Sequence, residues 1–299
     1  MADVIDSKDV YQFDEVYARL MQMDVEGIPG RTRGLKNAIP AKDLISLSGK
    51  TAIVTGGSRG LGVAIVNRLA EAGASVVIVD LADEFAEAAV AFFATKDYPV
   101  KYFKADVRDL EQIKAAIDFT VEEFGSLDIL VNNAGLWVVK HYYDITEDDW
   151  DLVVDVCLKG AFFFTQQAAI QMVKQGNGGR IVSTISVGAY SMENYFGCMA
   201  PYVAAKSGLL AITRSLSREL KPQGININCV CPPGMATVGG GHTKMPDDIR
   251  ELASSFPSVP VGDPDEIARV IAMVVSDVGV LFHGSDIVAD GGTRWQLTK

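Results

Sequence analysis

A tyrosine and a lysine one helical turn apart are the residues of this sequence best suited to move a proton. The run Tyr202-Val203-Ala204-Ala205-Lys206 opens an amphipathic stretch, and on a helix this spacing places the phenol and the ammonium on one face. A free phenol, with a pKa of about 10, is a poor general base at neutral pH, but a neighbouring ammonium favours the phenolate. The pair therefore predicts acid–base chemistry, with Tyr202 as the proton-transfer residue.

A glycine-rich segment further upstream is suited to hold a phosphate. Thr55-Gly56-Gly57-Ser58-Arg59-Gly60-Leu61-Gly62 follows an apolar run and opens a helix-length stretch that ends near Ala72. Glycines at 56, 60 and 62 let the backbone turn tightly and approach a pyrophosphate, whose charge is met by free N–H groups and the positive end of a helix. We therefore predict a dinucleotide site formed by Gly56, Ser58, Arg59, Gly60, Leu61 and Gly62.

Two charged residues bear on which dinucleotide would bind. The next apolar run ends at Asp80, whose carboxylate can accept hydrogen bonds from the adenosine ribose hydroxyls. The same carboxylate would repel a 2′-phosphate and so favours NAD over NADP. Arg59 could neutralise a 2′-phosphate or could be a solvated loop charge. Because Asp80 lies nearer the discriminating hydroxyl, we expect NAD, with NADP as the alternative.

The elements that position these residues follow from hydrophobic patterning. From Lys50 onward, short apolar runs alternate with helix-length amphipathic stretches, which is typical of βαβ units in a doubly wound α/β fold with a parallel sheet. Seven strands are expected, at 51–55, 75–79, 100–105, 129–132, 181–185, 225–230 and 286–288. Residues 1–46 differ, because an amphipathic stretch at 10–23 precedes a Gly/Pro/Arg-rich segment. We interpret them as a partly helical N-terminal arm appended to a catalytic domain at 47–299.

Composition narrows the classes of partner. The chain has 299 residues, 48% of them hydrophobic and 22% charged, as an ordinary globular protein has. A net charge of −11 argues against nucleic acid and anionic membrane surfaces, so we expect a small-molecule partner. Acidic residues near the N-terminus do not suit a secretory signal, and we expect the protein to stay in the cytoplasm.

Neither the cysteines nor the histidines are spaced as local metal ligands. The four cysteines lack a C-x-x-C spacing and the three histidines are far apart in sequence. We expect no metal site. We expect buried free thiols at Cys157, Cys198, Cys229 and Cys231.

Taken in order, the motifs resemble those of the short-chain dehydrogenases/reductases in their single-domain form. Thr55 to Gly62 is similar to the family's T-G-x-x-x-G-x-G loop, Asn132-Asn133-Ala134-Gly135 to its N-N-A-G element, and Asp290-Gly291-Gly292 to its C-terminal D-G-G. Ala105-Asp106-Val107 resembles the pair that contacts adenine. The resemblance runs from about residue 47 to 292. It implies a Rossmann fold and adds Asp106, Val107, Asn133, Ala134 and Gly135 to the cofactor site.

The resemblance also assigns catalytic roles. Ser186 matches the family's catalytic serine, whose hydroxyl holds the substrate oxygen, although Ser183 and Thr184 are neighbours that could take its place. Lys206 would also hold the nicotinamide ribose, which places Tyr202 and Lys206 in the cofactor site as well. The implied reaction is hydride transfer between nicotinamide and a secondary alcohol or ketone, with catalytic residues Ser186, Tyr202 and Lys206.

The sequence departs from the family pattern at two positions. Cys157 stands where the family has an asparagine that links the lysine to solvent through water, and a thiol cannot reproduce an amide's hydrogen bonds. Pro233 replaces the glycine of a P-G pair, while Pro232 and Thr237 keep the spacing expected for nicotinamide contacts. We expect an altered proton relay and a shifted backbone path at the nicotinamide.

Aromatic residues beside the expected pocket indicate an apolar, ring-bearing substrate, although half of them could instead be core or interface residues: Trp137, His141, Tyr142, Tyr143, Tyr195 and Phe196. Residues 238–260 would form a lid. His242 in that lid could touch substrate or face solvent. The resemblance implies a homotetramer or homodimer formed through the helices that carry Cys157 and Tyr202.

Two rival interpretations remain. One is an NADPH-dependent carbonyl reductase that uses the same residues. The other is a nucleotide-binding partner subunit without catalysis, which Cys157, Pro233 and the N-terminal arm would favour.

Overall fold

The computed structural model describes residues 39–190, 198–235, 244–254 and 262–292. Contacts divide the chain into two units, Met1–Leu44 and Ile45–Lys299. In the first unit the described residues, 39–44, form the 3-10 turn η2 (Ala41–Asp43). The amphipathic stretch predicted at 10–23 lies outside the described residues, so the N-terminal arm stays a prediction.

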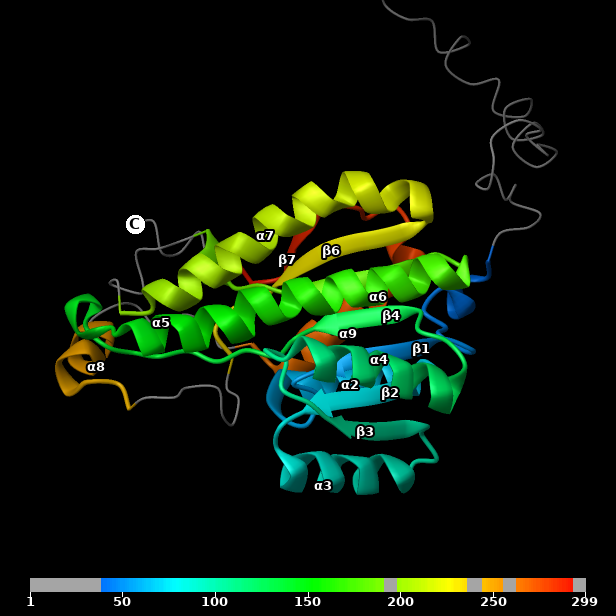
Figure 1. The fold of residues 1–299 in the computed structure, drawn as a ribbon, viewed down its shortest axis with the longest axis horizontal. Coiled ribbons are helices and arrows are strands. Elements are labelled where there is room, and N and C mark those ends of the chain that lie inside the picture. Colours follow the sequence, from blue (N-terminus) through cyan, green and yellow to red (C-terminus); the bar gives the residue numbers. More distant parts are fainter. Residues whose placement is uncertain (1–38, 191–197, 236–243, 255–261, 293–299) are drawn as a thin grey trace, which may run out of the picture. The chain divides into compact units, whose positions relative to one another are not determined.

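The second unit is built on a parallel sheet of seven strands in the order β3-β2-β1-β4-β5-β6-β7 (Figure 1). The strands are β1 (Thr51–Thr55), β2 (Ser75–Asp80), β3 (Val100–Lys104), β4 (Ile129–Asn132), β5 (Gly179–Thr184), β6 (Ile225–Cys231) and β7 (Asp286–Val288). Every predicted strand is present, and the largest difference is at β5, which begins two residues earlier than predicted. The predicted α/β fold is confirmed.

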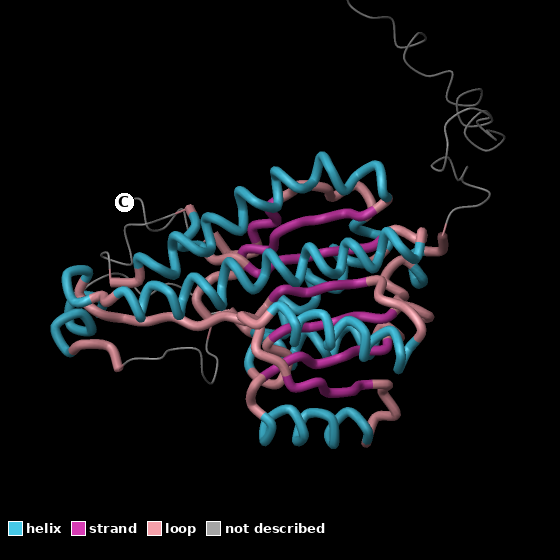
Figure 2. Tube along the Cα trace, in the orientation of Figure 1, coloured by secondary structure: helices cyan, strands magenta, loops and turns pink. Residues whose placement is uncertain are grey.

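Helices cover both faces of the sheet (Figure 2). The α-helices are α2 (Gly60–Glu71), α3 (Asp83–Ala94), α4 (Leu110–Phe124), α5 (Glu147–Val154), α6 (Ala161–Gln175), α7 (Ala200–Leu220), α8 (Asp247–Ser254) and α9 (Pro264–Val275). Short turns are η3 (Tyr142–Asp144), η4 (Asp155–Gly160), η5 (Val187–Ala189), η7 (Lys221–Gln223) and η8 (Asp277–Gly279).

The core forms two layers because successive strand residues point to opposite faces. Val54 of β1 packs in the cluster with α2, α3 and α9, whereas its neighbour Ile53 packs in the cluster with α4 and α6. All residues of β1, β4 and β6 are buried, as expected for parallel strands covered on both faces. Packing on both faces of the sheet therefore fixes the positions of the carboxyl ends of these strands.

A long helical segment, Glu147–Gln175, joins α5, the π-helical turn η4 and α6. By length and composition this segment could cross a membrane. However, Phe164, Ala168 and Met172 are buried against the sheet, which is the packing of a core helix. Figure 1 shows that α5, α8 and the start of α7 extend beyond the carboxyl ends of the strands.

The strand order reverses beside β1, because β2 lies on one side of it and β4 on the other. In open α/β sheets, ligands bind in the crevice outside the carboxyl ends at such a reversal. The Gly56 loop that follows β1 and the Asn133 segment that follows β4 flank this point.

Candidate active site

The glycine loop between β1 and α2 has a backbone that other residues would not adopt. Gly56 and Gly60 have φ angles of 62° and 55°, in the left-handed region that favours glycine. A Cβ atom on Gly62 would lie 1.9 Å from the carbonyl oxygen of Gly56. The loop therefore closes against the first turn of α2 only with glycine at position 62.

Asn133 and Thr55 fix the loop from the neighbouring strand. The Nδ2 atom of Asn133 donates to the carbonyl oxygens of Thr55 at 3.1 Å and Gly56 at 3.0 Å. In return, Oγ1 of Thr55 accepts from the backbone N–H groups of Asn133 and Ala134, both at 3.0 Å. Asn133 and Ala134 thus hold the glycine loop in shape, a role that their sequence position alone did not reveal.

The start of α2 suits an anion. Side-chain caps serve α4, α5 and α9, where Asp109, Thr146 and Asp263 accept from backbone N–H groups. Among the described residues, α2 has no such cap, so its first N–H groups remain available to a ligand. The side chain of Leu61 packs in the core, so only the backbone of this residue is on the side of the loop. These residues fit the pyrophosphate of a dinucleotide.

Asp80 is held beside the loop by four hydrogen bonds. Its Oδ2 atom accepts from Oγ of Ser58 at 2.5 Å and from the Ser58 N–H at 3.3 Å. Its Oδ1 atom accepts from the N–H groups of Leu81 at 2.8 Å and Ala82 at 3.2 Å. Ser58, predicted as part of the dinucleotide site, also orients the carboxylate expected to meet the ribose.

Arg59 points to α3. Its guanidinium lies 5.1 Å from the centre of the Phe85 ring, at a distance typical of a cation–π contact. Both residues are exposed. The side chain is thus packed along α3, and Phe85 is a partner that the sequence pattern did not indicate.

Asp106 and Val107 lie where β3 leads into α4. Both oxygens of Asp106 accept from Arg108, from Nε at 3.0 Å and from Nη2 at 2.6 Å, and this guanidinium lowers the pKa of the Asp106 carboxyl. Val107 is buried, and its carbonyl oxygen faces Gly160 of η4. Arg108 was not predicted, although opposite charges two residues apart in a loop were a visible signal.

The segment after β6 is described only to Met235. The carbonyl oxygen of Pro232 accepts from the Val187 N–H at 3.4 Å, which joins this segment to the turn after Ser186. The Pro233 ring packs against Gly262, where a Cβ would lie 2.7 Å from Cγ of the proline. Thr237 lies outside the described residues and its nicotinamide contact stays a prediction.

The catalytic candidates come from the end of β5 and the start of α7. Ser186 is buried and caps η5, its Oγ atom accepting from the Gly188 N–H at 3.2 Å. The buried ammonium of Lys206 donates to the Thr184 carbonyl oxygen at 2.7 Å. Its Nζ atom lies 5.6 Å from the centre of the Tyr202 ring, so β5 and α7 bring the lysine and the phenol together.

The two alternatives to Ser186 differ in their contacts. The hydroxyl of Ser183 accepts from Nδ2 of Asn132 at 3.3 Å inside the sheet. The buried Thr184 hydroxyl has no hydrogen-bond partner among the described residues, while its backbone carbonyl oxygen accepts from Lys206. Ser186 therefore stays the candidate because of its match to the family's serine.

Cys157 occupies η4 beside Lys206. Its thiol donates to the Leu136 carbonyl oxygen at 3.3 Å and accepts from the Leu136 N–H at 3.4 Å. Burial raises the pKa of this thiol, with Lys206 opposing the shift, and burial lowers the pKa of Lys206. A Cβ added to Gly135 would lie 3.6 Å from both Sγ and Nζ, so the space in front of the two groups is bounded by a glycine. All four cysteines are buried thiols outside any disulfide, as predicted.

One of the aromatic residues predicted at the pocket contacts Tyr202, the candidate proton-transfer residue. The rings of Trp137 and Tyr202 meet edge to face with centroids 6.1 Å apart. Trp137, Met199 and Met245 surround a small buried cluster of Val139, Cys198 and Ile249, which connects the tyrosine to α8. The predicted lid region thus contains a helix docked on apolar residues.

The other predicted aromatic residues lie further out. Tyr142 and Tyr143 are each 71% exposed. His141 stacks on Tyr143 at 5.3 Å, and its Nε2 atom lies 2.9 Å from Oδ2 of Asp248 in α8. Tyr195, Phe196 and His242 lie outside the described residues.

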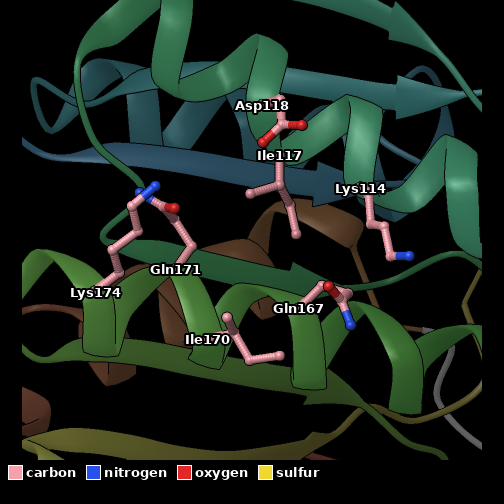
Figure 3. Close-up of a pocket in the computed structure, with 7 residues that line it drawn as sticks. All are labelled: Lys114, Ile117, Asp118, Gln167, Ile170, Gln171 and Lys174. Carbon is pink, nitrogen blue, oxygen red and sulfur yellow. The ribbon is translucent and has the colours of Figure 1, made fainter.

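A separate groove lies between α4 and α6, away from these groups (Figure 3). Its lining residues are Lys114, Ile117, Asp118, Gln167, Ile170, Gln171 and Lys174. They share no residue with the catalytic or nucleotide candidates. Within the described ranges, no group of three or more His, Cys, Asp or Glu residues is arranged to hold a metal.

Comparisons with known proteins show the family of this chain. Residues 50–245 match the family described as short chain dehydrogenase. A 3-oxoacyl-(acyl-carrier-protein) reductase, FabG, of Staphylococcus aureus is 36% identical over 245 residues, which are 81% of this chain and 97% of that protein. A 2-dehydro-3-deoxy-D-gluconate 5-dehydrogenase of Escherichia coli K12 is 34% identical over 252 residues, which are 83% of this chain and 96% of that protein.

Solved structures show the same fold. The crystal structure of a dehydrogenase/reductase from Sinorhizobium meliloti 1021 matches with a TM-score of 0.76 and 35% identity, covering 84% of this chain and 97% of that one. The chain therefore belongs to the short-chain dehydrogenases/reductases, a family of oxidoreductases that use a nicotinamide cofactor.

Proposed function

We propose that this chain is an NAD-dependent oxidoreductase that interconverts a secondary alcohol and a ketone. The observation that carries the proposal is the placement of Lys206 5.6 Å from the Tyr202 ring, at the carboxyl end of the strand that leads to Ser186. Bound nicotinamide would supply or accept the hydride. Tyr202 would exchange the hydroxyl proton with the substrate oxygen, and Ser186 would hold that oxygen by a hydrogen bond.

Lys206 would favour the phenolate of Tyr202 by its charge, and it would hold the cofactor in place by hydrogen bonds. Its ammonium is buried and donates to the carbonyl oxygen of Thr184, which holds it in one place. A charge in such a site interacts more strongly with a phenolate than it would in water. The remaining N–H groups of the ammonium are suited to hold the nicotinamide ribose hydroxyls.

NAD is the cofactor that the loop favours. The Asp80 carboxylate is fixed by Ser58 at the end of β2, and it would repel a 2′-phosphate while accepting from ribose hydroxyls. The packing of Arg59 on Phe85 supports the same choice, because it directs that guanidinium along α3. An NADPH-dependent carbonyl reductase with the same catalytic residues is the alternative.

The substrate would be an apolar, ring-bearing alcohol or ketone. Trp137 beside Tyr202, together with Met199 and Met245, offers apolar and polarisable surface. Residues 238–260 would act as the lid, with α8 as its described part. The names of the relatives point to an acyl chain in one case and a sugar acid in another, so they do not single out a substrate.

A homotetramer or homodimer in the cytoplasm is the expected form of the enzyme. Two apolar residues on α6, Ile170 and Val173, are 57% and 46% exposed. They lie on the helical segment that carries Cys157, which the resemblance assigns to a subunit interface. Burying such side chains against a second copy would stabilise the assembly.

A panel of ketones and secondary alcohols, assayed with each of NAD(H) and NADP(H), tests the proposal. We expect turnover with NAD(H), and a kcat/KM at least tenfold lower with NADP(H). Preference for NADP(H) would favour the carbonyl reductase. Nucleotide binding without turnover of any substrate would favour the partner subunit that Cys157 and Pro233 suggest.

A further inference from the structure

The short turn η5, which carries Ser186 at its start, is closed by backbone hydrogen bonds. The Ala189 N–H donates to the Ser186 carbonyl oxygen at 2.9 Å, and the Tyr190 N–H donates to that of Val187 at 3.0 Å. The Ser186 side chain itself caps the turn by accepting from the Gly188 N–H. Any displacement of this turn would therefore displace the Ser186 hydroxyl.

Tyr190 ends this turn with a side chain that reaches another part of the fold. Its hydroxyl donates to Oδ2 of Asp286, the first residue of β7, at 2.5 Å. Oδ1 of Asp286 accepts from Nη2 of Arg214 at 3.1 Å. Because Arg214 lies on α7, the same helix as Tyr202 and Lys206, this chain of hydrogen bonds joins the serine turn to the helix of the other two catalytic candidates.

The charges of this triad keep each bond in place at neutral pH. Partial burial and the neighbouring Asp286 raise the pKa of the Tyr190 phenol, so it stays protonated and remains a donor. Partial burial acts to raise the pKa of the Asp286 carboxyl, but hydrogen bonds from Tyr190 and Arg214 hold this pKa below its usual range. The carboxylate therefore stays an acceptor for both partners.

We infer that Tyr190 is a positioning residue for Ser186, which it holds in place through η5 by its hydrogen bond to Asp286. The inference rests on the proposed function, because Ser186 must itself act on the substrate oxygen. A misplacement of a catalytic group by about 1 Å can lower the rate by about 100-fold. A tether at the far end of a three-residue turn restricts such displacement.

The structure offers a substitution that removes the Tyr190 hydroxyl and keeps its ring. The Tyr190 ring packs against the cluster that contains Ile185, Val187 and Cys231, so Tyr190→Phe keeps the ring and deletes only the hydroxyl. Asp286 would still accept from Arg214 and would not become a buried unpaired charge. Tyr190→Phe is therefore expected to fold and to bind cofactor as the unaltered chain does.

The test is a double-mutant cycle between Tyr190 and Ser186, measured as kcat with a substrate from the activity panel. We expect Tyr190→Phe to lower kcat by about tenfold, with the dissociation constant for the cofactor unchanged. In a Ser186→Ala chain, which has already lost the hydroxyl, Tyr190→Phe should have no further effect. A purely structural role of Tyr190 would instead lower kcat equally in both backgrounds.

Two further variants complete the experiment. Asp286→Asn keeps an acceptor for the Tyr190 hydroxyl and should retain most of the activity, whereas Asp286→Ala should reproduce Tyr190→Phe. Tyr98→Phe removes the hydroxyl of a half-buried tyrosine that stacks on Phe93 of α3, outside the proposed site, and serves as the matched control. Should Tyr190→Phe prove unstable, Asp286→Ala in the two Ser186 backgrounds takes its place.

Unchanged kcat in Tyr190→Phe, or an equal loss with and without Ser186, would overturn the inference. Failure of the proposed function looks different, because then Tyr202→Phe and Ser186→Ala would both leave turnover unaltered. An unaltered chain without turnover on any substrate of the panel would overturn both.

Discussion

The Nζ atom of Lys206 lies 5.6 Å from the centre of the Tyr202 ring, and both side chains come from the first two turns of α7. The lysine is also bonded to the end of β5 through the Thr184 carbonyl oxygen. A helix and a strand thus fix the relative position of the phenol and the ammonium. The proposed chemistry depends on this arrangement.

Replacing Lys206 by methionine should separate its charge from its packing volume. Because the ammonium favours the phenolate, its loss should lower kcat by about 100-fold and move the acidic limb of the pH–kcat/KM profile to higher pH. Cofactor binding should also weaken. Lys221→Met, on the exposed turn η7, is the control, and an unshifted pH profile in Lys206→Met would contradict the role given to the charge.

Cys157→Asn tests the altered proton relay. An amide at this position would supply the donor and acceptor that the thiol lacks. Turnover should rise by about tenfold, less than the effect of a whole acid–base group, because the change acts only on the proton's route beyond Lys206. Cys157→Ser provides a polar group without the amide and should give a smaller gain. Unchanged turnover in Cys157→Asn would remove the claim that the relay is altered.

Asp80→Ala should change the choice of cofactor. Without the carboxylate, a 2′-phosphate is no longer repelled and Arg59 becomes free to turn from Phe85 toward it. The ratio of kcat/KM with NAD to that with NADP should fall by at least about tenfold, equivalent to about 1.4 kcal/mol. Ser58→Ala, which removes only the hydroxyl that holds Asp80, should lower the ratio less. A ratio unaffected by Asp80→Ala would contradict the basis for NAD.

The ion pair between α2 and α9 gives a prediction for stability. Arg68 donates to both oxygens of Asp265, at 2.5 and 2.8 Å, and this lowers the pKa of the Asp265 carboxyl. A lowered pKa stabilises the fold above the carboxyl's usual pKa, and that stability is lost as the pH falls through the folded value. Asp265→Asn should therefore lower the free energy of unfolding by about 1 kcal/mol at pH 7.

The same difference should disappear in acid. As the pH falls below about 4 and through the lowered pKa of the folded Asp265 carboxyl, the denaturant unfolding curves of Asp265→Asn and of the unaltered chain should converge. In an Arg68→Gln background, Asp265→Asn should have a smaller effect, because among the described residues Asp265 then keeps only its ion pair with Arg269 at 3.1 Å. A difference that persists in acid would assign the effect to packing and not to charge.

The sheet and the nucleotide loop were predictable because their signals are local. An apolar run of strand length indicates a strand at its own position. The glycines at 56, 60 and 62 indicate a tight backbone turn at theirs. Tyr202 and Lys206 share one helix, so their spacing alone indicated that they are neighbours. Ser186 needed the family resemblance, since Ser183 and Thr184 are hydroxyl residues close to it in the same segment.

The partners that shape the site were not predictable because they join residues distant in sequence. Tyr190 and Asp286 are 96 positions apart, and Ser58 and Asp80 are 22 apart. The π-helical turn at Cys157 and the docking of α8 on Trp137 likewise depend on tertiary packing. Hydrophobic periodicity carries no information about which polar side chains meet once the sheet has formed.

Tyr202→Phe tests the central claim most directly. The variant keeps the ring that packs against Trp137 and removes only the hydroxyl that exchanges the proton. In an assay that follows NADH absorbance, kcat should fall by about 10²–10⁴-fold, while the dissociation constant for NAD stays within about twofold of the unaltered chain's. Near-normal turnover in Tyr202→Phe would contradict the account.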